Sequence, residues 1–80
     1  MSEDVRRLVG GNVRRLRTAA GLTLAELAAK MGVDRAYVSA LELGGRNPTI
    51  ITLWHLAKAL GVRLAELFQE RSRPRKSVEQ

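Results

Sequence analysis

The segment Leu22–Gly44 constrains the fold of this chain more than any other part of its sequence. It holds two short stretches in which apolar residues recur every three or four positions, the spacing of one face of an α-helix. Thr23 and Glu26 form a capping box before the first stretch, and Gly32 supplies a tight turn before the second. The pattern therefore predicts two short helices, over 24–31 and about 35–43, that pack against each other.

The second of these helices has two chemically different faces. Asp34 precedes it as an N-cap, and Val38 and Leu41 lie three positions apart on its inner face. Its outer side carries residues that can reach a ligand: Arg35, Ala36, Tyr37 and Ser39. Two helices arranged in this way form a helix-turn-helix, a motif that places its second helix in the major groove of DNA.

Length and charge agree with a small nucleic-acid binder. The 80 residues are enough for one domain, and 14 Lys and Arg, mostly arginine, against 8 Asp and Glu give a net charge of +6. Arginine suits bidentate contacts with phosphate and guanine, so the charge favours double-stranded DNA as partner. A solubilising surface, or a genome rich in arginine codons, is the alternative explanation.

Several classes of protein are disfavoured by what the chain lacks. It has no cysteine, so disulfides and thiolate metal sites are excluded and a reducing cytoplasm is expected. No apolar run reaches the roughly 18–20 residues that span a bilayer, and the first residues lack the apolar stretch of a secretory signal. We therefore expect no membrane association. No catalytic triad, carboxylate pair, phosphate loop or metal-ligand cluster stands out, so the sequence predicts no enzyme, no cofactor and no small-molecule substrate.

The remaining chain predicts an all-α, compact five-helix domain over residues 1–70. A first helix is expected over about 4–20, with a kink or a late start at Asn12 because Gly10 and Gly11 weaken a helix interior. A fourth helix is expected over about 50–60 with Thr49 as cap, and a fifth over 64–69. The inward positions of these helices are apolar: Val5, Leu8, Val9, Val13, Leu16, Ala20, Ile50, Leu53, Leu56, Ala57, Leu60, Leu64, Leu67 and Phe68. Residues 71–80 are basic, lack periodicity and are expected to be disordered.

The whole set of motifs from Val13 to Phe68 resembles the lambda-repressor/Cro-type helix-turn-helix family, also called the XRE family. The resemblance is carried by GLT, ELA, Gly32-Val33, Tyr37-Val38-Ser39, Leu41-Glu42, Gly44, Asn47-Pro48 and LAKALGV, in that order. The stretch DRAYVSALELGGRNP also resembles the controller proteins of restriction-modification systems, which are small dimeric regulators. The resemblance implies a lambda-repressor-like DNA-binding domain with the helix-turn-helix over about 24–43.

It also implies a role for each position of the site. The positions that touch base edges in the family hold Arg35, Ala36, Tyr37, Ser39 and Ala40, and the positions that touch phosphates hold Thr23, Arg46, Asn47 and Thr49. Arg35 is the best base reader, because its guanidinium can donate two hydrogen bonds to O6 and N7 of guanine. A solvated charge for Arg35 and partial packing for Tyr37 are the alternatives. Leu24 stands where the family often has a phosphate-binding glutamine, so that contact is expected to be missing or replaced.

Two further sets of residues receive structural roles. Arg17 and Glu42 match positions that pair in the family, and we expect a partly buried salt bridge between them, the alternative being two unrelated surface charges. Apolar and aromatic residues where helices should face outward predict a homodimer interface: Ile51, Trp54, His55, Val62, Leu64 and Phe68. Core packing is the competing explanation for Leu64 and Phe68.

The sequence thus predicts a DNA-binding transcriptional regulator of bacterial or phage type, located in the cytoplasm with the nucleoid. It would act as a homodimer on a palindromic operator and would read the major groove with its third helix. A restriction-modification controller is one such regulator. The alternative is an antitoxin or adaptor module whose main role is to bind a protein partner. The operator, the regulated gene, the choice between activation and repression, and DNA binding by residues 71–80 stay open.

Overall fold

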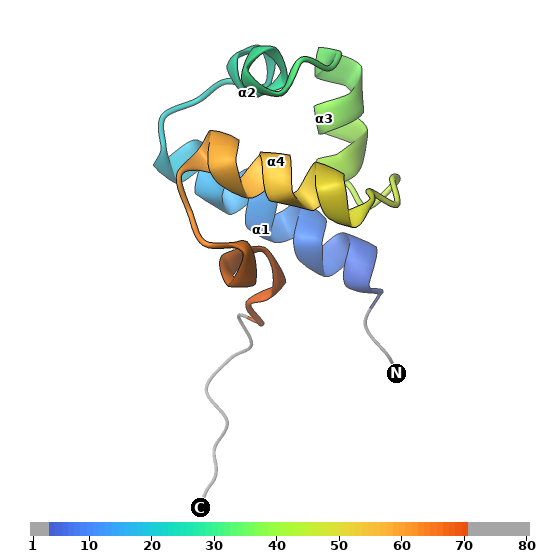
Figure 1. The fold of residues 1–80 in the computed structure, drawn as a ribbon. Helices are drawn as coiled ribbons and strands as arrows, with labels where there is room; N and C mark the ends of the chain where they lie inside the picture. The colour runs from blue at the N-terminus through green and yellow to red at the C-terminus, as the bar shows by residue number, and fades with distance from the viewer. Residues whose placement is uncertain (1–3, 71–80) are drawn as a thin grey trace, which may run out of the picture.

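The computed structural model describes residues 4–70, and these fold into an all-helical domain (Figure 1). The elements are α1 (Val5–Ala19), α2 (Leu24–Met31), α3 (Arg35–Glu42), α4 (Ile50–Leu60) and η1 (Leu64–Phe68). The predicted all-α class is confirmed. The fifth helix is corrected in type, because η1 is a 3-10 helix of 5 residues rather than an α-helix. The predicted tail over 71–80 lies outside the described residues.

The first helix is longer and more regular than its glycines suggested. Asp4 caps α1 by accepting a hydrogen bond from the Arg6 amide at 3.0 Å, and the helix runs unbroken through Gly10 and Gly11. The predicted kink, or a start at Asn12, is therefore wrong. Gly10 is buried against the backbone of α3, so its missing side chain serves packing between helices rather than a break in the helix.

The two helices of the predicted motif are present and follow the predicted signals. Thr23 and Glu26 form the capping box of α2, and Gly32 ends that helix with a φ of 71°, in the left-handed region that favours glycine. Leu27 and Ala28 are buried, while Leu24 is only half-buried. Asp34 stands at the N-cap position of α3, but its side chain makes no capping hydrogen bond, so that part of the prediction is wrong.

The core lies between α1, α4 and η1 on one side and the α2–α3 pair on the other (Figure 1). Its members are apolar side chains at helical spacing: Val9, Val13, Leu16, Leu27, Ala28, Val38, Leu41, Leu53, Leu56, Ala57, Leu60 and Leu67.

Some residues that were predicted to belong to the core lie outside it. Val5 and Ala20 lie at the ends of α1 and are exposed. Ile50 occupies the first position of α4, where no core residue covers it, and 76% of its surface is exposed. Phe68 is also exposed.

A buried asparagine fixes the end of the domain to α1. The side chain of Asn12 is 3% exposed and donates hydrogen bonds to the carbonyl oxygens of Leu67 and Gln69, both at 2.9 Å. Arg15 donates to the Asn12 amide oxygen at 3.1 Å. A buried amide is stable only when its polar atoms are paired, and here both are.

No helix within residues 4–70 is long and apolar enough to cross a membrane.

Candidate nucleic-acid interface

The side of α3 that faces away from the core is most accessible at its first turn. Arg35 and Ala36, at the start of α3, are exposed, whereas Val38 and Leu41 on the opposite side are buried in the core. The other three predicted base-contacting residues, Tyr37, Ser39 and Ala40, are half-buried. Ala40 lies at the covered end of the helix, where its carbonyl accepts a hydrogen bond from the Gly45 amide at 2.8 Å. The first turn of α3 is thus the part most free to meet a ligand.

The loop after α3 adds a cation to this surface. The Arg46 guanidinium lies over the Tyr37 ring, 5.1 Å from its centre, which is the geometry of a cation–π contact. The contact joins a predicted phosphate-binding residue to a predicted base-binding residue. Sequence reasoning missed it, since nine positions and a loop separate the two residues. Asn47, next along the loop, is exposed.

The two threonines predicted to bind phosphate are helix caps in the structure. The Thr23 hydroxyl accepts a hydrogen bond from the Glu26 amide at 3.0 Å, and the Thr49 hydroxyl accepts one from the Thr52 amide at 3.1 Å. Both residues are exposed, and a capping hydroxyl retains its own proton; the Thr49 hydroxyl also lies 3.1 Å from the Thr52 hydroxyl, and either of these two can donate to the other. Capping and a phosphate contact are therefore compatible at these positions.

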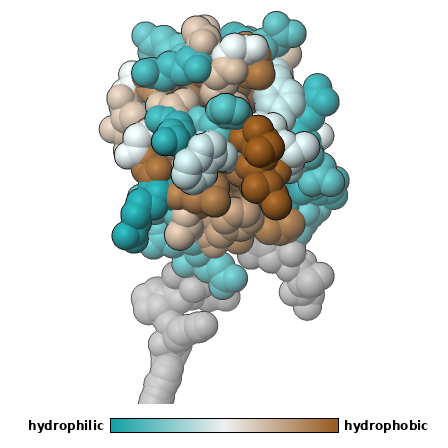
Figure 2. All heavy atoms as spheres, viewed as in Figure 1, coloured by the Kyte–Doolittle hydropathy of each residue, from teal (hydrophilic) through white to brown (hydrophobic). Residues whose placement is uncertain are grey.

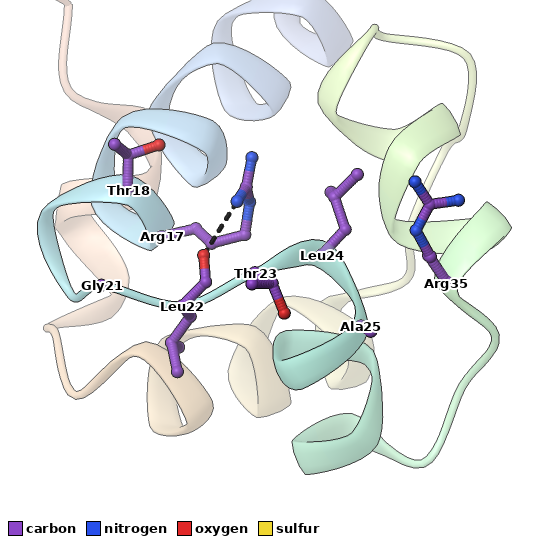
Figure 3. Close-up of a pocket in the computed structure, with 8 residues that line it drawn as sticks. All are labelled: Arg17, Thr18, Gly21, Leu22, Thr23, Leu24, Ala25 and Arg35. Atoms are coloured by element: carbon purple, nitrogen blue, oxygen red, sulfur yellow. Dashed lines mark hydrogen bonds between the residues drawn. The ribbon is translucent and has the colours of Figure 1, made fainter.

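An open groove runs from the end of α1 past the start of α2 to the start of α3 (Figure 3). Its lining combines two arginines with small and apolar residues: Arg17, Thr18, Gly21, Leu22, Thr23, Leu24, Ala25 and Arg35. Leu24 stands between Arg17 and Arg35 in this view. The amides of the first turn of an α-helix lack acceptors within the helix, so the start of α2 gives this groove free donors.

Arg17 does not point out of the groove as a free cation. Its Nε donates to Glu42 Oε2 at 2.6 Å, its Nη2 to Glu42 Oε1 at 3.1 Å, and its Nη1 to the Leu22 carbonyl at 2.9 Å. The side chains of Arg17 and Glu42 are only 14% and 6% exposed. The hydrogen bonds that Arg17 donates to the Glu42 carboxylate raise the pKa of Arg17 above its ordinary value. The expected salt bridge is thus present, and it joins α1 to the last turn of α3.

A separate apolar surface lies on α4 and η1, and we call it the α4 patch. Ile50, Ile51, Trp54 and Phe68 form its exposed part. Figure 2 shows an apolar area on the face where α4 lies in front, with polar residues around it. Lys58 covers part of it, its Nζ lying 4.9 Å from the centre of the Trp54 ring. His55 is exposed. Two other predicted interface residues, Val62 and Leu64, are half-buried and pack against the core.

The described residues, 4–70, contain no candidate metal centre. No group of three or more His, Cys, Asp or Glu side chains within this range could hold an ion.

The arrangement of α2, turn and α3 over a small helical core defines a helix-turn-helix DNA-binding domain of the XRE type. The chain belongs to the HTH_3 helix-turn-helix family, whose sequence profile matches residues 13–67. The family comprises DNA-binding transcriptional regulators and is not a family of enzymes.

Relatives and solved structures agree with this family. The chain is 55% identical over 64 residues to the uncharacterized HTH-type transcriptional regulator y4dJ of Sinorhizobium fredii, covering 80% of this chain and 83% of that protein. It is 32% identical over 68 residues to the control protein C.MunI of a Mycoplasma species, covering 84% and 92% of the two chains. The restriction-modification controller protein C.AhdI from Aeromonas hydrophila superposes with a TM-score of 0.76 at 41% identity, over 79% of this chain and 96% of that one. The chain is therefore a helix-turn-helix transcriptional regulator.

Proposed function

We propose that this regulator binds DNA in a sequence-specific manner by inserting α3 into the major groove. The observation that carries the proposal is the division of α3 into two sides. Val38 and Leu41 anchor the helix in the core, while Arg35 and Ala36 are exposed at the end of the helix that enters the groove first in this motif. The net charge of +6 supports an anionic partner.

Arg35 is the residue to which we assign most of the discrimination between sequences. It is exposed and makes no salt bridge within residues 4–70 in this structure, so its guanidinium is available for O6 and N7 of a guanine. The other base-contacting residues we propose are Ala36, Tyr37, Ser39 and Ala40, with Ala40 the most restricted because of its place under the loop.

The phosphate contacts are assigned to residues on either side of α3. Arg46 and Asn47 follow it in the loop, and Thr23 and Thr49 cap the helices that begin beside it. Such contacts hold the register of a protein on DNA without reading its sequence. The side chain of the half-buried Leu24 cannot donate a hydrogen bond, so the start of α2 would hold phosphate through its backbone amides and the Thr23 hydroxyl.

We further propose that the regulator acts as a homodimer through an interface that combines Ile51, Trp54 and Phe68 of the α4 patch with the predicted residues His55, Val62 and Leu64. The structure adds Ile50 to this set, because it is exposed beside Ile51. Two copies related by a twofold axis would present two α3 helices about 34 Å apart to a palindromic operator. One relative reported above is named as a control protein and one solved structure as a restriction-modification controller protein, which supports that biology for this chain as well.

The DNA proposal is tested with sites selected from a pool of random duplexes. Binding of wild type, Arg35→Ala and Arg46→Ala to the selected site and to random duplex is then measured over a salt series. We expect Arg35→Ala to lower the ratio of specific to random affinity by about tenfold or more. We expect Arg46→Ala to weaken both affinities and to reduce the salt slope by about one unit. Arg63→Ala is the matched control, since it removes the same charge at an exposed position before η1, outside the helix-turn-helix and the loop that follows it. An unchanged ratio in Arg35→Ala would contradict the assignment.

The homodimer is tested by sedimentation with Trp54→Glu. The charge would face the second copy, so we expect the variant to be a monomer at concentrations where wild type is a dimer, with unchanged helix content. Lys30→Glu is a control of larger charge change on an exposed position of α2. A wild type that stays monomeric at every concentration would refute the dimer and would favour a different protein partner for the α4 patch.

A further inference from the structure

The backbones of α1 and α3 pack closely at Gly10. A Cβ atom built on Gly10 would lie 2.7 Å from the Glu42 carbonyl oxygen and 2.9 Å from its carbonyl carbon, and closer still to the carbonyl oxygen of Leu41. These atoms belong to the backbone of the last turn of α3, which cannot rotate away as a side chain can. Any side chain at position 10 would therefore push that turn of α3 away from α1.

The neighbouring glycine shows that the requirement is specific to one position. Gly11 lies in the same helix, and a Cβ atom there would have no neighbour within 4 Å. Alanine is the better helix former at both positions, so helix formation explains neither glycine. At Gly10 alone, packing supplies a reason for the missing side chain.

The same end of α3 is held to α1 at two other points. Arg17, two helical turns after Gly10, pairs with Glu42. Arg7, one turn before Gly10, lies under Gly44, where a Cβ atom would be 2.8 Å from Arg7 Cγ. One face of α1 thus contacts the end of α3 and Gly44, two residues further along the chain, and Gly10 lies between Arg7 and Arg17 on that face.

Displacing this end would change how α3 meets DNA. With 8 residues, α3 is about 12 Å long and behaves as a short rigid rod. A shift at Leu41 and Glu42 therefore tilts the rod and moves Arg35 at its other end. Hydrogen bonds to base edges need donor–acceptor distances close to 2.9 Å, so they are sensitive to a tilt. Contacts of flexible side chains with phosphates tolerate it better.

We propose that Gly10 is a positioning residue for sequence recognition: it lets α3 sit close enough to α1 to present Arg35 to the bases in register. This inference rests on the proposed function, in which α3 reads the major groove. Under this proposal, Gly10 affects discrimination between DNA sequences although it is buried and touches no base.

The experiment compares Gly10→Ala, Gly11→Ala and the double variant. Gly11→Ala is expected to bind like wild type and to raise the Tm by about 4–8 °C, as a better helix former in a domain of this size. Gly10→Ala is expected to keep its affinity for random duplex within about twofold and to lose about tenfold in the ratio of specific to random affinity, as for one bidentate base contact. In the double variant, the Gly11→Ala change should restore the Tm. It should not restore the ratio of specific to random affinity, and this result would separate an effect on the position of α3 from an effect on stability.

All variants are measured in an osmolyte such as trimethylamine oxide, which favours the folded state, and folding is checked by circular dichroism. A wild-type ratio in Gly10→Ala, or recovery of the ratio in the double variant, would overturn the inference. Failure of the double variant to fold in the osmolyte would also overturn it, because position 10 would then control folding rather than the placement of α3. The underlying function fails separately: in that case wild type itself would not discriminate, or Arg35→Ala would leave discrimination unchanged.

Discussion

Replacing Arg17 with methionine removes one half of the ion pair that joins α1 to α3. Methionine keeps an unbranched apolar stem of similar length, so the packing of the stem is largely preserved. The variant loses two hydrogen bonds to Glu42 and one to the Leu22 carbonyl. The Glu42 carboxylate, whose side chain is only 6% exposed, is left buried without a cation.

The expected loss is a large fraction of the total stability. Breaking a buried pair by removing one partner costs about 3–5 kcal/mol, chiefly because the other charge stays buried and unpaired. A domain of this size has a free energy of unfolding of about 4–12 kcal/mol, at roughly 0.05–0.15 kcal/mol per residue. Arg17→Met should therefore be marginally folded at 25 °C.

The assay is urea unfolding followed by circular dichroism for wild type, Arg17→Met, Glu42→Leu and the double variant. Because the double variant has no unpaired charge, we expect it to be more stable than Arg17→Met and within about 2 kcal/mol of wild type. Arg6→Met is the matched control: its partner Asp4 lies 2.8 Å away, but both side chains are more than 40% exposed, so only a small change is expected.

Two results would refute this reasoning. One is a loss below about 1 kcal/mol in Arg17→Met, the range of an exposed pair. The other is simple addition of the two single losses in the double variant, which would mean that Arg17 and Glu42 do not interact energetically.

The remaining predictions concern the ends of the helices. Asn12→Ala leaves the Leu67 carbonyl without its donor and should lower the free energy of unfolding by about 1–3 kcal/mol in urea; a loss near zero would contradict the buried tie between α1 and η1. Thr23→Ala removes the α2 cap and should cost about 1 kcal/mol in the same assay, and no loss would mean that the cap is dispensable. The side chain of Arg6 lowers the pKa of Asp4 from 3.8 to about 2, so Asp4 stabilises the folded state fully above pH 4 and this contribution disappears as the pH falls through 2. The stability difference between wild type and Asp4→Asn should follow that course, and a difference that does not vary with pH would exclude this titration.

Local signals predicted the helices well. Thr23 and Thr49 mark the starts of α2 and α4, and Gly32 marks the end of α2, in the sequence and in the structure alike; Gly61 ends α4 in the same left-handed conformation. Caps and left-handed glycines act within one turn of the chain, so their effect can be read without knowing the fold.

Features that depend on distant parts of the chain were not predictable in this way. Asn12 binds carbonyls 55 and 57 positions away, and Gly10 meets α3 only after both helices have packed. Ile50 has the spacing of a core residue, but the extent of the core is set by where the other helices end, and it stops short of the first position of α4. Helical periodicity identifies a face and does not say how far along that face the neighbours reach.

The candidate site shows the same division. The exposure of Arg35 follows from its helical position, and the pairing of Arg17 with Glu42 was expected from the resemblance to the XRE family. The placement of Arg46 over the Tyr37 ring depends on the path of the loop between α3 and α4, which no local signal specifies.

The central claim, that the outward side of α3 reads bases, is tested most directly by methylation interference on a selected DNA site. Methyl groups on guanine N7 block a bidentate arginine in the major groove. The account predicts that methylation of one guanine in each half-site abolishes binding by wild type, and that Arg35→Ala binds the methylated and unmethylated sites equally. Interference at the same guanine in both proteins, or no interference in wild type, would contradict it.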